Sequence, residues 1–215
     1  MTSVFISGSI DLKSIPQTVR ISLDNIINQN LHIVIGDAEG IDLAVQKYLN
    51  EKKYFNVTIF SITSPPRNCI SDKFNIKYID YKNTVEYISL SEQEKAKIEY
   101  SERKKQTFKD IEMSKYADYF LTIWDGKSEG TKNNLLRGIQ NNKKIKLIIN
   151  NEIIQPDIIS EEYINNIFDD LNGIGIKELR RRLDNALGED NIPSKDYIKH
   201  SDLLKNIYPL SSKTF

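Results

Sequence analysis

Short apolar runs alternate with segments of helical periodicity along the first 150 residues of this chain. The runs are rich in β-branched residues, as buried strands are, and the segments between them repeat apolar residues every three or four positions. A chain that alternates in this way forms right-handed strand–helix–strand units, with parallel strands and with helices on both faces of the sheet. The sequence therefore predicts an α/β fold. The expected strands are 3–7, 31–35, 57–62, 119–124 and 144–149, and the expected helices are 17–28, 40–49, 91–116 and 131–141.

The strand pattern stops after the last of these runs. A helical pattern covers residues 161–171, and another over 176–187 places an apolar stripe beside three arginines at 180–182. We therefore expect two parts, a domain of residues 1–150 and a helical C-terminal extension of residues 151–215.

The arginines of the extension leave two interpretations open. They either contact DNA or form a solvated helix face, which is the commoner role of such a run. The apolar stripe beside them covers a sheet edge or makes a homodimer.

The composition is that of a globular protein, with 39% hydrophobic and 28% charged residues. The 30 basic residues balance the 30 acidic ones, so net charge does not point to nucleic acid or an anionic membrane as the main partner. No apolar run approaches the roughly 18 residues that a membrane-spanning helix needs. The single cysteine, Cys69, fits a reducing compartment. We therefore expect a cytoplasmic protein with no membrane contact.

Residues that commonly hold metals or act as nucleophiles are scarce. The two histidines, His32 and His200, and the single cysteine do not have the spacing of metal ligands or of a Ser-His-Asp or Cys-His catalytic set. We expect no metal and no cofactor, and a structural role for His32 at the start of a strand.

Polar turns follow four of the expected strands, and three of these turns contain glycine. In an open parallel sheet, ligands bind outside the carboxyl ends of the strands, so these turns meet at the edge where a ligand is expected. The turns are Gly8-Ser9, Gly36-Asp37-Ala38-Glu39-Gly40, Ser64-Pro65-Pro66-Arg67-Asn68 and Asp125-Gly126-Lys127-Ser128-Glu129-Gly130-Thr131.

Two of these turns suit an anion. Glycines such as Gly36 and Gly40 permit a sharp turn and close approach of a ligand to the main chain, where free N–H groups at a helix start favour phosphate. Gly126, Gly130 and Thr131 repeat the arrangement before a second helix, where Thr131 either caps the helix or donates to a phosphate oxygen. Together the two turns predict a ligand of nucleotide size.

The charged residues of the turns have alternative roles. Asp37, Asp42 and Asp125 can accept hydrogen bonds from ribose hydroxyls or a base, or they can cap helices and complement the helix dipole. The fork of Arg67 fits phosphate oxygens, and the alternative is a surface arginine. The candidate ligand-binding residues are therefore Gly8, Ser9, Gly36, Asp37, Ala38, Gly40, Asp42, Ser64, Arg67, Asp125, Gly126, Ser128, Gly130 and Thr131. We expect Trp124 to be a core residue, and the segment between Arg67 and Tyr116 to form a wall or lid of the pocket.

Three of these motifs, in this order, resemble the SLOG superfamily, a Rossmann-like group that includes the LOG phosphoribohydrolases and DprA-type proteins. They are GS after the first strand, GDAEGID into the second helix and WDGKSEGT after a later strand. The turn GDAxGxD is similar to that of the YspA-like branch. The resemblance covers roughly residues 3–150 and implies a Rossmann-like sheet and a homo-oligomer.

The resemblance implies a nucleotide or nucleotide-derived ligand, such as an ADP-ribose, NAD or signalling nucleotide. The first expected function is a binding protein, a sensor or sequestering protein for that ligand. The alternative is an enzyme that cleaves an N-glycosidic bond, a phosphoribohydrolase or a deoxyribosyltransferase-like protein. Gly130 and Thr131 match the PGGxGTxxE turn of LOG enzymes, but Asn134 stands where that turn has its catalytic glutamate. Glu129 and Asp125 are then the candidate catalytic residues, although Glu129 can equally be a solvated loop acid.

Overall fold

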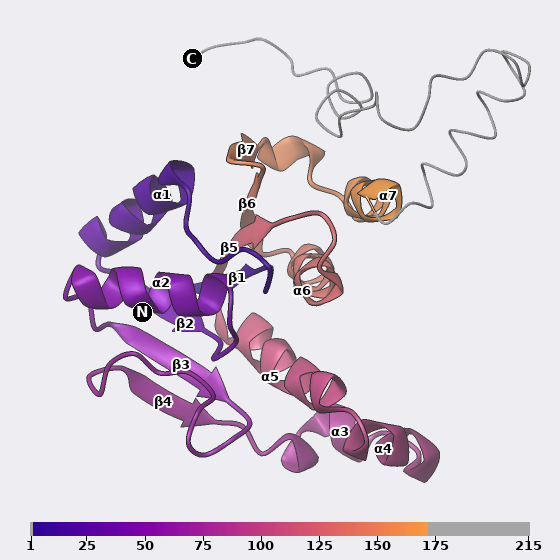
Figure 1. The fold of residues 1–215 in the computed structure, drawn as a ribbon. Coiled ribbons are helices and arrows are strands. Elements are labelled where there is room, and N and C mark those ends of the chain that lie inside the picture. Colours follow the sequence, from indigo (N-terminus) through magenta and orange to yellow (C-terminus); the bar gives the residue numbers. More distant parts are fainter. Residues whose placement is uncertain (1, 172–215) are drawn as a thin grey trace, which may run out of the picture. The chain divides into compact units, whose positions relative to one another are not determined.

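The structure is a computed structural model that describes residues 2–171. Its centre is a seven-stranded sheet with the strand order β4-β3-β2-β1-β5-β6-β7 (Figure 1). All neighbouring strands are parallel except β7, which is antiparallel to β6. This confirms the expected α/β, Rossmann-like fold. The strands are β1 (Ser3–Gly8), β2 (His32–Ile35), β3 (Val57–Ser61), β4 (Asn75–Tyr78), β5 (Tyr119–Trp124), β6 (Lys144–Ile149) and β7 (Glu152–Ile154).

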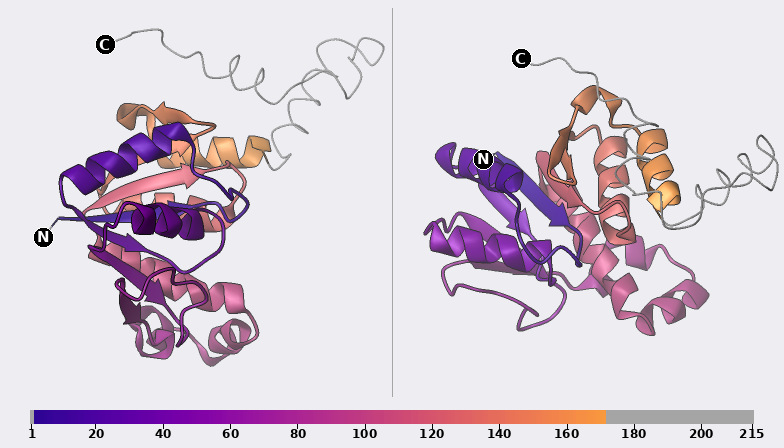
Figure 2. Two further views of the ribbon diagram at one scale, coloured as in Figure 1. Left: turned by 60° about the vertical axis from the view of Figure 1, so that its left-hand side comes forward. Right: turned by 45° about the horizontal axis from the view of Figure 1, so that its top comes forward.

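Helices cover both faces of this sheet (Figure 2). They are α1 (Gln17–Asn28), α2 (Ile41–Glu51), α3 (Val85–Ile88), α4 (Glu92–Glu99), α5 (Glu102–Tyr116), α6 (Glu129–Gln140) and α7 (Glu161–Leu171). Two 3-10 turns, Tyr81–Asn83 and Pro156–Ile158, complete the described part.

The alternation of side chains along the strands decides which helices each face packs against. Val4 and Ile6 of β1 belong to a buried cluster with Leu23 of α1 and other residues of α1 and α2. Phe5, which points to the opposite face, belongs to a cluster with Met113 of α5. One strand thus supports a helix layer on each side.

A third buried cluster joins β5 and β6 to the helices that follow them. Trp124 is 1% exposed and packs with Leu135 of α6 and with Ile164 and Ile167 of α7. Its indole nitrogen donates to the main-chain oxygen of Ser128 at 3.0 Å. The expected core role of Trp124 is confirmed.

Two strands were not expected from the sequence. All four residues of β4 are exposed, so this edge strand has no alternation of buried and exposed side chains that a pattern could reveal. β7 has only three residues. The expected single helix over 91–116 is instead two helices, because Ser91 and Ser101 cap α4 and α5 separately.

The compact unit continues beyond the boundary expected at residue 150. Among the described residues it includes α7, because β7 pairs with β6 and the apolar side of α7 packs on α6. The helical pattern at 176–187, its arginines and the suggested DNA and dimer contacts lie outside the described residues. Within residues 2–171, every helix is too short or too polar to cross a membrane.

His32 has the structural role that was expected. It is 8% exposed. Its Nδ1 lies 2.8 Å from Oδ1 of Asn56, and its Nε2 lies 3.1 Å from Oγ1 of Thr58. Both ring nitrogens are therefore engaged in holding β2 beside β3.

Candidate functional site

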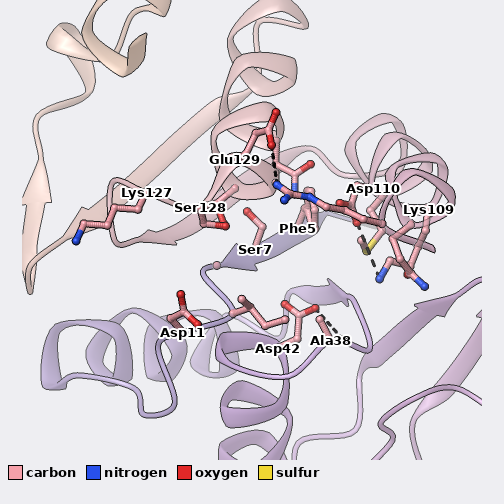
Figure 3. Close-up of a pocket in the computed structure, with 18 of the residues that line it drawn as sticks. Phe5, Ser7, Asp11, Ala38, Asp42, Lys109, Asp110, Lys127, Ser128 and Glu129 are labelled. Atoms are coloured by element: carbon pink, nitrogen blue, oxygen red, sulfur yellow. Dashed lines mark hydrogen bonds and ion pairs between the residues drawn. The ribbon is translucent and has the colours of Figure 1, made fainter. Parts of the chain in front are cut away.

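A cavity of about 730 Å³ lies at the carboxyl edge of the sheet (Figure 3). The strand order reverses at β1, which has β2 on one side and β5 on the other. Such a switch point leaves a crevice, because the chain leaves the neighbouring strands toward opposite faces of the sheet. The end of β1, the start of α2, one face of α5 and the first turn of α6 form the walls.

The turns expected at this edge do meet there, but only some of their residues reach the cavity. Among the residues of these turns and of the helix starts that follow them, those that line the cavity are Gly8, Ala38, Asp42, Arg67, Lys127, Ser128, Glu129, Gly130 and Thr131. The expected candidates that are not among its lining residues are Ser9, Gly36, Asp37, Gly40, Ser64, Asp125 and Gly126.

Asp37 is a fully buried anchor beneath the cavity. Its Oδ1 accepts hydrogen bonds from Nη2 of Arg67 at 2.7 Å and from Nζ of Lys109 at 2.9 Å. Its Oδ2 accepts from Oγ of Ser61 at 2.8 Å and from the main-chain N–H of Arg67 at 3.1 Å. The cap interpretation of Asp37 is wrong, because Gly40 is the N-cap of α2.

The charges around Asp37 keep it ionised. Burial alone would raise its pKa, but the hydrogen bond from Arg67 and the charge of Lys109 hold the pKa well below its usual range. The Arg67 guanidinium and the Lys109 ammonium thus share the single carboxylate of Asp37. Together these three groups carry one net positive charge beside the cavity. Arg67, whose side chain is 39% exposed, is held in position there by Asp37.

Gly36 and Gly40, which precede α2, lie against other protein atoms that would overlap a Cβ. A Cβ on Gly36 would lie 2.5 Å from Oδ2 of Asp42 and 3.0 Å from Nζ of Lys109. Gly40 has φ +75°, and its missing Cβ faces the main chain of Ile10. Both glycines therefore allow close packing within the protein.

Ser9 and Ser64 also lie outside the cavity lining. Ser9 is fully buried, and its Oγ accepts a hydrogen bond from the main-chain N–H of Asp125 at 3.0 Å. This bond ties the turn after β1 to the turn after β5. Ser64 is exposed and precedes a cis proline, Pro65.

The turn before α6 is shaped by Asp125. Its Oδ1 accepts the main-chain N–H groups of Lys127 and Ser128, both at 2.8 Å, while Gly126 adopts φ +77°. Ser128 is the N-cap of α6, so the capping role suggested for Thr131 is wrong. No side-chain oxygen caps this helix start among the described residues, and its first turn faces the cavity.

Glu129 lies in that first turn, at the rim. Its Oε2 accepts a hydrogen bond from Nη2 of Arg103 at 2.8 Å, and the two side chains are 60% and 71% exposed. A pair this exposed contributes little to stability, so both residues can turn to a ligand.

The α5 wall contains the residues that the sequence did not single out. Gln106, Lys109, Asp110 and Met113 follow one another at helical spacing and all line the cavity, which confirms that the segment before Tyr116 forms a pocket wall. The side chain of Lys109 is 3% exposed. In the sequence, these charged residues look like the solvent-exposed face of a long polar helix. Only the packing of α5 on the sheet shows that they line a cavity.

Asp42 and Asp110 enter the cavity from opposite walls, α2 and α5 (Figure 3). Burial raises the pKa of Asp42 to about 7, opposed by the charge of Lys109 and assisted by that of Asp110. Burial likewise raises the pKa of Asp110, against the charge of Lys109. Oδ2 of Asp42 accepts the main-chain N–H of Ala38 at 3.2 Å. The site therefore holds one carboxyl group, that of Asp42, whose pKa lies near neutral pH, beside a second, that of Asp110, whose pKa is raised.

The Asp42→Asn variant should show a pH-dependent gain in stability. The unfolded chain releases the proton of Asp42 near its usual pKa of 3.8, whereas the folded protein keeps it up to about pH 7. The wild type therefore loses stability as pH rises between these values. We expect the variant to be more stable than the wild type at pH 8, on the order of 4 kcal/mol, and nearly equal at pH 4. Urea unfolding at the two pH values measures both differences.

Asp72, which is exposed, supplies the control for that experiment. The Asp72→Asn variant should change the stability at pH 8 by no more than about 0.5 kcal/mol. A gain for Asp42→Asn that did not change with pH would contradict the raised pKa.

Within residues 2–171, no three His, Cys, Asp or Glu side chains come together in a way that could hold a metal ion. Comparison with protein-family models finds no match to the chain. Comparisons with characterised proteins and with solved structures find no significant match either.

Proposed function

We propose that this protein binds a nucleotide or nucleotide-derived ligand, as a sensor or a sequestering protein. The observation that carries the proposal is the position of the cavity, at the switch point of a parallel sheet, where such folds hold nucleotides. Its volume of about 730 Å³ suits a ligand of that size.

The phosphate would lie at the start of α6. The first turn of this helix has no side-chain cap, and it presents Gly130 and Thr131 to the cavity. Main-chain N–H groups at a helix start favour an anion. A Cβ on Gly130 would have no atom of residues 2–171 within 4 Å, so within the described part the space beside this turn is open to a ligand. Arg67 and Lys127 add positive charge on either side.

The sugar hydroxyls would face the carboxyl groups of Asp42 and Asp110. A carboxyl group that is protonated near pH 7 can donate a hydrogen bond to a hydroxyl, and an ionised one can accept. This pair therefore suits a polyol better than a second phosphate, because phosphate would be repelled once either carboxyl ionised.

Gly130→Asp tests the phosphate position without disturbing the fold. A carboxylate in the first turn of α6 favours the helix dipole, but it repels phosphate. We expect at least about tenfold weaker binding of the ligand, with an unchanged or higher melting temperature. Equilibrium dialysis against nucleoside monophosphates, ADP-ribose and NAD first identifies the ligand, and calorimetry then compares the variants.

Gly130→Ala is the matched control, because its methyl group meets open space and adds no charge. It should bind within about threefold of the wild type, a change below 1 kcal/mol. The proposal is wrong if the wild type enriches none of the panel, and the phosphate position is wrong if Gly130→Asp binds as well as Gly130→Ala.

Cleavage of an N-glycosidic bond is a second candidate, supported by Asp42. A carboxyl with a pKa of about 7 in a cavity can donate a proton to a leaving base, while Asp110 stabilises the developing positive charge on the sugar. Asp42 is then a better catalytic candidate than Asp125, whose carboxylate holds the turn, or Glu129, which pairs with Arg103 at the rim. Mass spectrometry of the dialysis mixtures separates the two functions, because an enzyme releases free base and sugar phosphate and a binding protein returns the ligand intact.

A further inference from the structure

The part of the cavity wall formed by α5 and α6 carries two carboxamide side chains, Gln106 and Asn134. Oε1 of Gln106 is buried and has no hydrogen-bond partner among residues 2–171. A buried carbonyl left without a donor costs about 1–3 kcal/mol. Among residues 2–171, one other buried side-chain oxygen has no hydrogen-bond partner. It belongs to Glu86, which does not line the cavity. No side-chain hydrogen bond within residues 2–171 holds the Gln106 amide, so a half-turn of the side chain brings its carbonyl to the cavity, where an N–H of a ligand can bond to it.

Asn134 offers the opposite group. Its Oδ1 accepts a hydrogen bond from Nη1 of Arg137 at 2.7 Å. A guanidinium has donors and no acceptor, so this contact fixes the orientation of the amide. The –NH₂ group of Asn134 has no acceptor within residues 2–171, although the residue is only 5% exposed. The wall therefore carries one unused acceptor and one unused donor.

The floor beside these amides is apolar. Phe5 and Met113 line the cavity and are 1% and 2% exposed, because both belong to the core between β1 and α5. A flat ring with polar atoms on its edge matches an apolar floor and an amide-bearing wall. Nucleobases have this form, since the Watson–Crick edge of every base carries an N–H donor next to an acceptor. Ribose and phosphate groups do not.

We propose that Gln106 and Asn134 form a base-binding subsite, in which the Gln106 carbonyl accepts an N–H of a nucleobase and the Asn134 amide donates to a neighbouring ring nitrogen or carbonyl. This inference rests on the proposed function and names the part of the ligand that the α5–α6 wall recognises. Arg137 acts as a positioning residue, because it holds the Asn134 amide and does not itself line the cavity.

The test compares ribose 5-phosphate with the four ribonucleoside 5′-monophosphates, which contain the same sugar phosphate plus a base. Calorimetry should show that the wild type binds at least one nucleotide about tenfold or more tightly than ribose 5-phosphate. Gln106→Met keeps the length of the side chain and removes its hydrogen-bonding atoms. We expect about 3- to 10-fold weaker binding of that nucleotide, from loss of one hydrogen bond, and unchanged binding of ribose 5-phosphate.

Two variants make the test specific. Gln140→Met is the same substitution on an exposed residue outside the cavity, and it should change neither affinity. Gln106→Asn withdraws the carbonyl by one methylene group while keeping a polar side chain, so it should also lose affinity for the nucleotide alone. Gln106→Met should be at least as stable as the wild type in urea, because it removes a buried oxygen without a partner.

The possible failures are distinguishable. Equal affinity of the wild type for ribose 5-phosphate and all four nucleotides would overturn the subsite and leave phosphate binding in place. An equal loss of both ligands in Gln106→Met would mean that Gln106 supports the shape of the cavity and does not contact a base. No binding of any of these probes by the wild type would contradict the subsite, and the absence of ADP-ribose and NAD binding as well would contradict the proposed function.

Discussion

Asp37→Asn should destabilise the folded protein by about 3–5 kcal/mol, the usual cost of removing one member of a buried ion pair. The variant leaves Lys109, whose side chain is 3% exposed, without the carboxylate that its ammonium contacts at 2.9 Å. It also removes the partner that holds the main chain and guanidinium of Arg67. Urea unfolding at pH 7 measures the loss.

A double-mutant cycle shows whether the unpaired ammonium is the cause. Lys109→Met replaces the buried ammonium with an apolar group of similar length. Combined with Asp37→Asn, it should recover a large part of the lost stability, because no buried charge is then left without a partner. If the double variant were as unstable as the sum of the two single variants, the two residues would not be coupled and this explanation would be wrong.

Gly40→Ala should be destabilising by about 3 kcal/mol or more. Gly40 has φ +75° and ψ −130°, a conformation that residues with a Cβ rarely adopt. The added methyl group would also meet the main-chain carbonyl of Ile10, which belongs to another loop and cannot rotate away as a side chain would. Thermal and urea unfolding of the variant test this result.

The effect of Gly40→Ala should be compared with that of Gly130→Ala. The methyl group at position 130 is in a helix and has no neighbour within 4 Å, so this variant should be unchanged or more stable by about 0.5–1 kcal/mol. Similar losses at the two positions would contradict the distinction between a packed loop glycine and an open helical one. A substitution at Gly40 therefore tests folding, and one at Gly130 tests ligand binding.

The layout of the sheet and the edge that carries the cavity could be predicted from sequence, because they depend on local patterns. β1, β2, β3, β5 and β6 are buried apolar runs, and helical segments separate most of them. β4 was not predicted, because it lies at the edge of the sheet and all its residues are exposed. β7 was not predicted, since a three-residue strand leaves almost no periodic signal.

The sequence placed the expected ligand-binding residues at the edge of the sheet where the cavity lies, but it did not reveal their contacts. Gly130, Asp42 and Arg67 line the cavity as expected, whereas Asp37 supports it from beneath. The two cationic partners of Asp37 lie 30 and 72 residues further along the chain, so no local motif could indicate that its carboxylate is occupied. Gln106 and Asn134 were not proposed as ligand contacts, because an amide in a polar helix gives no sign of burial until the helix is packed.

By itself, the sequence determined an α/β chain whose glycine-rich turns gather at the carboxyl edge of a parallel sheet. Strand burial and the positions of the turns depend on neighbouring residues, so they could be predicted, whereas the capping roles within the turns could not. The tertiary structure alone decided which charged and amide groups are buried, which are already paired and which face the cavity. Burial and pairing depend on segments that meet only in the folded chain, and they determine whether Asp37 anchors the site, Asp42 holds a proton or Gln106 has a free carbonyl.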